Sequence, residues 1–266
     1  MKIIVCVKQV PDTSGKVAVN PDGTLNRASM ATITNPDDLN AVEAALVMKE
    51  QTGAEVVVVC MGPPPAEGML RECLARGCDR AVLVSGREFG GSDTYATSQI
   101  LAAAINKIGV DAEDIVMCGR QAIDGDTAQV GPQIAVKLGL PQISYAADIQ
   151  LDGKTVTVKR MLEDGYMTVK TQTPCLITCI KELNEPRYMS VYGIFDCYSK
   201  PYEVLDYNAL KDDPLIDPST IGLMGSPTNI LTSFTPPQKG AGMMLEGADK
   251  ATCDQLAGML AAKHMI

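Results

Sequence analysis

Short runs of apolar, mainly β-branched residues recur along the first half of the chain. They occupy residues 3–7, 56–60, 81–84 and 115–118. Unbroken apolar runs of this length are typical of strands that are buried on both faces of a sheet. Longer segments of helical pattern separate these runs. Strands that alternate with helices in this way predict a doubly wound, mainly parallel α/β sheet.

The helices between these strands are recognised by the residues at their ends. The first is expected to begin at Asn35, an N-cap followed by Pro36 and two aspartates, and to end at Gly53. Proline at the first position and acidic residues in the first turn both favour a helix start. Three further helices are predicted, over residues 66–76, near 92–108 and near 126–138.

Turn signals become frequent after residue 142. Two Asp-Gly pairs separate β-type runs between residues 142 and 180, which predicts antiparallel additions that complete the sheet as a meander. A Pro-Asp-Gly turn earlier in the chain predicts a hairpin over residues 17–26.

The last third of the chain has a different character. From about residue 183 the sequence is irregular and rich in proline and aspartate, and a short helix is predicted over residues 246–263. A core-poor segment of this length is expected to lie over another surface. The predicted organisation is therefore an α/β domain over residues 1–183, followed by an irregular C-terminal arm over residues 184–266.

Composition narrows the class of protein. The net charge of −9 argues against a nucleic-acid-binding or anionic-membrane surface, and no apolar run approaches the roughly 18–20 residues of a membrane span. The first apolar run is five residues long, shorter than the core of about 7–15 residues in a signal peptide. We expect a cytoplasmic protein whose first strand begins at the mature N-terminus.

The nine cysteines do not indicate disulfides or a metal site. Cys60 and Cys118 lie inside apolar runs and no CxxC pair occurs, so free thiols that pack as small hydrophobes are expected. The only histidine is His264, near the end of the chain, and the cysteine spacings are not those of zinc or iron–sulfur ligands.

Three strand ends bring polar or glycine-bearing segments to one edge of the predicted sheet. They are Cys6–Lys8, Met61–Gly62 and the segment from Gly119 onward. Ligands of open α/β sheets bind beyond the carboxyl ends of the strands, and amides at the start of a helix near residue 126 would attract phosphate. An ordinary, well-capped turn between strand and helix is the competing interpretation.

Within the segment from Gly119 onward, the charged residues suggest different roles. Arg120 would neutralise a diphosphate, and Thr127 would assist the helix amides in holding phosphate. Asp124 and Asp126 would repel phosphate, so we expect them to cap the helix or to orient loop amides.

Motifs for an acid–base or nucleophilic mechanism are missing from the sequence. It contains neither GxGxxG nor GxxxxGK[ST], and no GxSxG elbow. A bound redox cofactor that supplies its own chemistry therefore fits the sequence better than a hydrolase does.

Five motifs in order resemble one family, the β subunit of electron-transferring flavoproteins. They are VCVKQVPD at 5–12, NPDD at 35–38, MGPP at 61–64, GRQAIDGDTAQVGP at 119–132 and LNEPRY at 183–188. The resemblance implies a nucleotide-binding α/β (HUP-like) fold, and a C-terminal arm that packs on an α subunit in an obligate heterodimer. It also implies that no side chain of this chain acts as a catalytic acid or base.

The resemblance further implies a ligand site and a partner surface. The residues implied in binding the ligand are Cys6, Asn35, Pro36, Asp37, Asp38, Met61, Gly119, Arg120, Gln121, Ala122, Ile123, Asp124, Gly125, Asp126, Thr127, Ala128, Gln129 and Val130. Those implied in recognising an acyl-CoA dehydrogenase are Asn184, Glu185, Pro186, Arg187, Tyr188 and Val191.

Two short motifs resemble the electron-bifurcating branch of this family, EDGY at 163–166 and GGSDTYATS at 90–98. That branch implies FAD as the ligand, with Ser92, Asp93, Thr94 and Thr97 near its flavin ring. NADH would then give a hydride to this FAD, with one electron passing to the α-subunit FAD and the other to ferredoxin or flavodoxin. Two alternatives stay open: a non-bifurcating β subunit that holds structural AMP, and a stand-alone nucleotide-binding enzyme or sensor of related fold.

Overall fold

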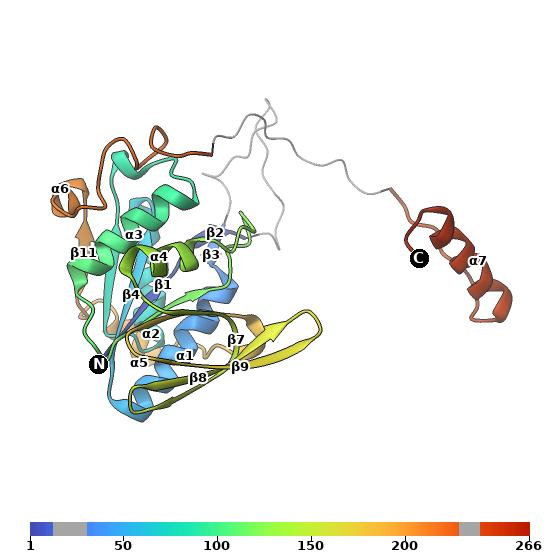
Figure 1. Cartoon of the computed structure of the whole chain (residues 1–266), viewed down its shortest axis with the longest axis horizontal. Coiled ribbons are helices and arrows are strands. Elements are labelled where there is room, and N and C mark those ends of the chain that lie inside the picture. The colour runs from blue at the N-terminus through green and yellow to red at the C-terminus, as the bar shows by residue number, and fades with distance from the viewer. Residues whose placement is uncertain (13–30, 229–239) are drawn as a thin grey trace. The chain divides into compact units, whose positions relative to one another are not determined.

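The computed structural model describes residues 1–12, 31–228 and 240–266 (Figure 1). These residues belong to two compact units, which are described separately: an α/β unit up to residue 228 and a C-terminal unit from residue 240. The hairpin expected over residues 17–26 lies outside the described residues.

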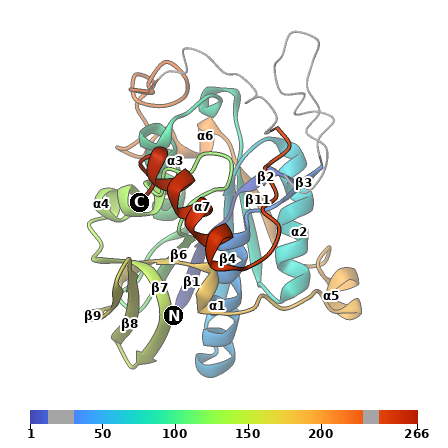
Figure 2. The same ribbon diagram turned by 90° about the vertical axis from the view of Figure 1, so that its right-hand side faces the viewer.

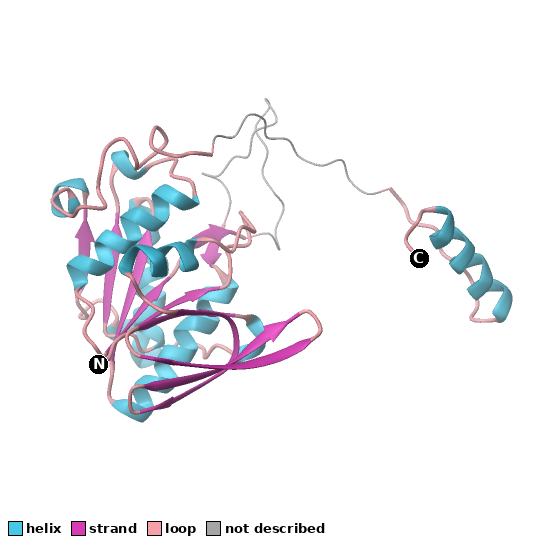
Figure 3. Cartoon of the chain, in the orientation of Figure 1, coloured by secondary structure: helices cyan, strands magenta, loops and turns pink. Residues whose placement is uncertain are grey.

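One nine-stranded sheet forms the centre of the α/β unit (Figure 3). Its strands are β1 (Lys2–Cys6), β4 (Glu55–Met61), β5 (Arg80–Val84), β6 (Ile115–Gly119), β7 (Gln142–Asp152), β8 (Thr155–Leu162), β9 (Gly165–Gln172), β10 (Cys175–Cys179) and β11 (Tyr202–Leu205). Their order is β11-β5-β4-β1-β6-β10-β7-β8-β9, and all pairs from β11 to β7 are parallel. The pairs β7–β8 and β8–β9 are antiparallel. The predicted fold class, a mainly parallel α/β sheet with antiparallel additions, is confirmed.

Helices cover both faces of this sheet (Figures 1 and 2). Those of the α/β unit are α1 (Pro36–Thr52), α2 (Glu67–Arg76), α3 (Thr94–Ile108), α4 (Val130–Leu138), α5 (Val191–Asp196) and α6 (Tyr207–Leu210), with short 3₁₀ turns η2 (Pro64–Ala66), η3 (Arg87–Phe89) and η4 (Lys181–Leu183). A small separate sheet pairs β2 (Gln9–Pro11) with β3 (Thr32–Thr34).

Alternate residues of each strand face the two helical layers. Ile3 and Val5 of β1 belong to the core that includes α1 and α2, whereas Ile4 belongs to the core that includes α3 and α4. The central strands are therefore buried on both faces, which explains their unbroken apolar runs. Eight of the nine cysteines are buried and all nine are free, but Cys253 is exposed, so the prediction of buried thiols is wrong at that position.

The structure differs from the predicted elements in three places. β10 is not part of the antiparallel meander, because it lies parallel between β6 and β7, and all five of its residues are buried. α4 begins at Val130 rather than near residue 126. The segment beyond residue 183 is less irregular than expected, since β11 joins the edge of the sheet beside β5. The described residues of the compact α/β unit run to residue 228.

The C-terminal unit contains one helix, α7 (Lys250–Ala262), among its described residues. The Asp249 side chain caps it by accepting a hydrogen bond from the amide of Thr252 at 2.8 Å. No helix in the described parts of the chain is long and apolar enough to cross a membrane.

Candidate functional site

The carboxyl edge of the sheet is formed by neighbouring strand ends. Cys6 ends β1, Met61 ends β4 and Gly119 ends β6, as the sequence predicts. Cys179 ends β10 and pairs in register with Gly119, an arrangement that sequence reasoning missed because β10 was expected elsewhere in the sheet. The start of α1 approaches so closely that a side chain at Gly119 would collide with Asp37 and Asp38.

Asn35 joins the start of α1 to the loop that follows β6. Its side-chain amide donates to the carbonyl of Gln121 at 2.8 Å, and its side-chain oxygen accepts from the amide of Ile123 at 3.1 Å. The residue is fully buried. Its side chain makes no capping bond to α1, so Asn35 holds the loop in place instead of stabilising the helix end.

Asp38 joins the same helix to two strand ends. Its carboxylate accepts hydrogen bonds from the amide of Lys8 at 2.8 Å and from the amide of Gly119 at 3.0 Å. Burial raises the pKa of Asp38 to about 7, although these two amides and the side chain of Asn35 favour the charged form. Asp38 is therefore engaged with protein groups and contributes to the site by fixing backbone.

The two aspartates of the loop do not cap α4. Lys8 binds both carboxylate oxygens of Asp124, at 2.7 and 2.9 Å, and the side chain of Gln121 donates to Asp126 at 2.8 Å. The expected cap fails because the helix begins four residues beyond Asp126, at Val130.

Left-handed backbone occurs twice in the loop between β6 and α4. Asp126 and Ala128 have φ of 49° and 51°, a conformation that few non-glycine residues adopt. Thr127 lies between them and is exposed.

The N-terminus of α4 carries backbone amides without a helical partner. Helices leave the first turn of N–H groups unbonded, and the N-cap residue Gln129 makes no side-chain capping bond. Gly131 lets this turn approach the sheet, since a Cβ there would lie 2.8 Å from Cγ2 of Thr178. These amides can hold an anionic group.

Arg120 is directed toward Asp37. Its Nε lies 3.2 Å from a carboxylate oxygen of Asp37. The two atoms form an ion pair but not a hydrogen bond, and each is buried without a hydrogen-bonding partner. Burial raises the pKa of Asp37, and the charge of Arg120 partly offsets this effect. Arg120 thus balances local negative charge beside the loop.

The start of α3 supplies fewer free groups than the sequence suggests. Ser92 donates to the carbonyl of Phe89 at 2.8 Å, and Asp93 caps α3 by accepting from the amide of Ala96 at 3.0 Å. Thr94 donates to the side chain of Gln129 at 3.2 Å, which connects α3 to the loop. Thr97 is half-buried one turn into the helix.

The predicted partner-recognition residues divide into two groups. Asn184 and Arg187 face α1: Asn184 exchanges hydrogen bonds with Asn40, and Arg187 binds Glu43 and Glu50. Tyr188 is 94% exposed and Val191 is 75% exposed. Glu185 is exposed and Pro186 is half-buried.

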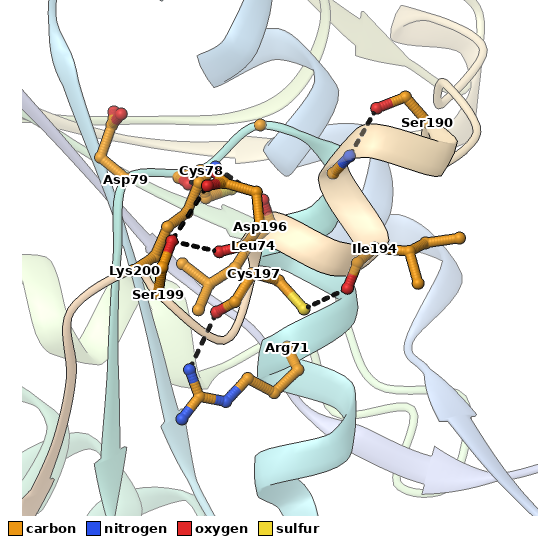
Figure 4. Close-up of polar contacts among 12 residues, drawn as sticks. Arg71, Leu74, Cys78, Asp79, Ser190, Ile194, Asp196, Cys197, Ser199 and Lys200 are labelled. Atoms are coloured by element: carbon orange, nitrogen blue, oxygen red, sulfur yellow. Dashed lines mark hydrogen bonds and ion pairs between the residues drawn. The ribbon is translucent and has the colours of Figure 1, made fainter.

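Helix α5 is docked on α2 through polar contacts that Figure 4 shows. Arg71 donates to the carbonyl of Cys197 at 2.9 Å, and Lys200 donates to the carbonyls of Leu74 and Cys78, each at 2.9 Å. Gly193 permits this approach, because a Cβ there would collide with the carbonyl of Ala75.

Three aromatic side chains on and beside α5 are exposed but were not predicted as partner residues: Tyr192, Phe195 and Tyr198. The missed signal was local composition, because these residues lie within seven positions of a chain that is only 4% aromatic. Together with Tyr188 and Val191 they form what we call the α5 surface.

A mainly parallel sheet with a glycine-bearing loop and an uncapped helix at its carboxyl edge is typical of nucleotide-binding α/β proteins. The family described as "Electron transfer flavoprotein domain" matches residues 22–204, more than half of the chain. The chain therefore belongs to the electron transfer flavoprotein family.

Individual relatives agree with this assignment. The chain is 66% identical over 267 residues, all of both chains, to the acryloyl-CoA reductase electron transfer subunit gamma of Anaerotignum propionicum. It is 51% identical over 265 residues, 99% of this chain and 97% of the relative, to the caffeyl-CoA reductase-Etf complex subunit CarD of Acetobacterium woodii. It is 49% identical over 267 residues, all of both chains, to the electron transfer flavoprotein subunit beta of Clostridium acetobutylicum. The predicted resemblance to the β subunit is confirmed, and the stand-alone enzyme or sensor loses its support.

Proposed function

We propose that the chain is the β subunit of a heterodimeric electron transfer flavoprotein and binds FAD at the carboxyl edge of its sheet. The observation that carries this proposal is the connection of three segments around the uncapped N-terminus of α4. Asn35 ties α1 to the loop after β6, and Thr94 ties α3 to Gln129 at the helix start. A dinucleotide needs contacts of this extent, because its diphosphate and its two ring systems occupy separate places.

The residues present fit such a ligand. The first-turn amides of α4 would hold the diphosphate, and Lys8 and Arg120 would offset its charge from their ion pairs with Asp124 and Asp37. Thr94 and Thr97 at the start of α3 would lie toward the flavin ring. The role of this chain is to bind, orient and tune the cofactor.

When bound, FAD would accept a hydride from NADH and divide its electrons, one to the FAD of the α subunit and one to ferredoxin or flavodoxin. The similarity to subunits named for acryloyl-CoA reductase and caffeyl-CoA reductase complexes supports an acyl-CoA dehydrogenase or reductase as the acceptor beyond the α subunit. No side chain of this chain is required as an acid or base.

AMP is the second candidate ligand, and one observation favours it. Ser92, Asp93 and Thr94 are already engaged in hydrogen bonds, so of the four side chains only that of Thr97 remains for a flavin ring. AMP needs only the amides of α4 and the segments beside them.

Counting cofactors separates the two candidates. The chain is purified together with its α subunit, its nucleotides are released with acid, and they are quantified by chromatography. Two FAD per heterodimer, with flavin reduction on anaerobic addition of NADH, is the expected result. One FAD and one AMP per heterodimer would contradict the FAD proposal and support the second candidate.

The α5 surface is proposed as the contact for the acyl-CoA dehydrogenase or reductase. Exposed aromatic side chains held on a fixed support are typical of interface anchors, and Arg71, Lys200 and Arg187 fix this support on α1 and α2. Val191→Ala is compared with Val136→Ala on α4, because the two valines are 75% and 76% exposed. We expect Val191→Ala and Phe195→Ala to weaken partner binding by about tenfold each. Equal binding by these variants and the Val136 control would exclude the surface.

A further inference from the structure

Asp38 lies at the point where three elements of the ligand site meet. It is in the first turn of α1, and its two oxygens accept the amides of Lys8 after β1 and Gly119 at the end of β6. Its side chain is buried, and the missing Cβ of Gly119 leaves the space that this contact requires. The carboxylate therefore fixes where the loop after β6 begins.

We propose that Asp38 is a positioning residue whose ionised carboxylate aligns the loop after β6, so that nucleotide binding is coupled to the loss of its proton. The inference rests on the proposed function, which supplies the nucleotide. A carboxylate accepts both amides strongly, whereas the hydroxyl oxygen of a protonated carboxyl is a weak acceptor and leaves one of the two N–H donors poorly paired. An unpaired buried donor is costly, so protonation loosens the loop at Lys8 or at Gly119.

Several charged or titratable groups face Asp38 from the elements around it. Asp37 of α1 repels it, while Lys8 and Arg120 are each paired with another aspartate. The buried thiols near Asp38 are Cys60 of β4, Cys118 of β6 and Cys179 of β10. Burial raises the pKa of Cys60 to about 12 and raises that of Cys179 still further. For Cys118, the hydrogen bond with Cys6 raises the pKa first and burial adds to it.

Two carboxyls near the loop have pKa values raised above the ordinary value of an aspartate. The pKa of Asp38 stands at about 7, and burial also raises the pKa of Asp37. Substitution of Asp38 alone tells these two groups apart.

The same sheet supplies a matched control at its opposite edge. Asp114 is buried, and its carboxylate accepts the amide of Lys2 at 2.6 Å and the amide of Asp111 at 2.8 Å. Asp114→Asn removes a buried carboxylate that holds two backbone amides, far from the carboxyl ends of the strands. It reports the structural cost of such a change without touching the ligand site.

The test uses the heterodimer of this chain with its α subunit. The nucleotide is removed first, and the protein is then titrated with FAD between pH 6 and pH 9. The site of the α subunit is common to all variants, so differences between variants report this chain. Wild type and Asp114→Asn are expected to bind FAD about tenfold more weakly at pH 6 than at pH 8. In calorimetry with two buffers of different ionisation enthalpy, binding should release about half a proton at pH 7 and none at pH 9. Asp38→Asn should show neither effect.

The possible failures are distinct. Absence of FAD binding to this chain at pH 8 would contradict the proposed function, and AMP then serves as the probe for Asp38. When the wild-type affinity for AMP is divided by the Asp38→Asn affinity at each pH, the effect of the titration of AMP itself cancels. A pH-independent ratio, proton uptake instead of release, or proton release that persists in Asp38→Asn would overturn the inference. If Asp38→Asn does not fold, Asp37→Asn takes its place: proton release that persists in this variant supports the inference, and loss of the release assigns the proton to Asp37 and overturns it.

Discussion

The guanidinium of Arg187 forms two parallel hydrogen bonds with the carboxylate of Glu43, each 2.8 Å long. The amide of Arg187 donates to the same carboxylate at 3.0 Å, and Arg76 donates to the carbonyl of Arg187. Burial alone would raise the pKa of Glu43, but the hydrogen bonds from Arg187 outweigh it and the pKa is lowered. A residue inside the predicted recognition motif thus anchors the motif on α1.

Replacement of Arg187 by lysine or glutamine should therefore weaken the attachment of the recognition motif to α1, and not a direct contact with the partner. Loss of the paired hydrogen bonds is expected to lower the free energy of unfolding by about 1–3 kcal/mol and to weaken partner binding, with the bound nucleotide retained. Denaturant titration, partner affinity and nucleotide content measure these three quantities. The stability difference from wild type should shrink as pH falls below the ordinary Glu pKa of 4.5, because protonated Glu43 no longer pairs with Arg187.

Lys250→Gln is the control for this prediction. Lys250 pairs with Asp254, and the two side chains are 90% and 65% exposed. Exposed pairs contribute little, so the stability should change by less than about 0.5 kcal/mol. An equal loss in both variants would show that Arg187 has no special anchoring role.

Asp38 should make the nucleotide-free chain less stable as pH rises, which is the reverse of the usual effect of an aspartate. Its pKa is raised from 3.8 to about 7, so the native state holds a proton that the unfolded state has lost. The contribution is fully present below pH 3.8 and is lost as pH rises through 7. Urea titrations at several pH values should show wild type losing stability relative to Asp38→Asn over this range. A constant difference between the two would refute the prediction.

Gly131→Ala and Gly125→Ala test the close approach of α4 to the sheet. An added Cβ at Gly131 lies 2.8 Å from Thr178, whereas at Gly125 no atom lies within 4 Å. We expect Gly131→Ala to lose about 1–3 kcal/mol of stability through overpacking and to retain less nucleotide. Gly125→Ala should unfold at the denaturant concentration of wild type. Equal midpoints for both variants would contradict this account.

Thiol titration should distinguish one cysteine from the rest. Cys253 is exposed on α7 and the other eight are buried, with the pKa of Cys60 raised by burial to about 12. Since the thiolate is the reactive form, a disulfide reagent should modify one thiol rapidly in the native protein and nine in denaturant. Cys253→Ser should abolish the rapid phase, and a rapid phase that remains would show that the buried thiols are accessible.

The sequence predicts the α/β layers well because its signals are local. Proline, aspartate and glycine mark the two ends of α1, and unbroken apolar runs identify the central strands. The place of β10 could not be predicted in this way, since a parallel neighbour is chosen by pairing across the sheet rather than by local pattern. The start of α4 was misplaced because Asp126 is a common N-cap residue, yet its left-handed backbone excludes it from the helix.

For the candidate site, the sequence indicates which segments meet but not which atoms are engaged. Asn35 and Asp38 carry polar groups suited to a ligand, and the structure shows both bound to backbone instead. The same holds for Arg187, which the family resemblance places among the partner-recognition residues but which is paired with Glu43. Such internal pairing joins residues that are far apart in the chain, so no local motif reveals it.

The position of β10 also has a consequence for how the chain can be synthesised. β10 is made after β7, β8 and β9, yet it lies between β6 and β7. A nascent chain that ends before Cys175 therefore exposes two unpaired strand edges, that of β6 and that of β7. Unpaired edges invite association with other chains, so these two edges add to the risk of aggregation until the five residues of β10 have been synthesised.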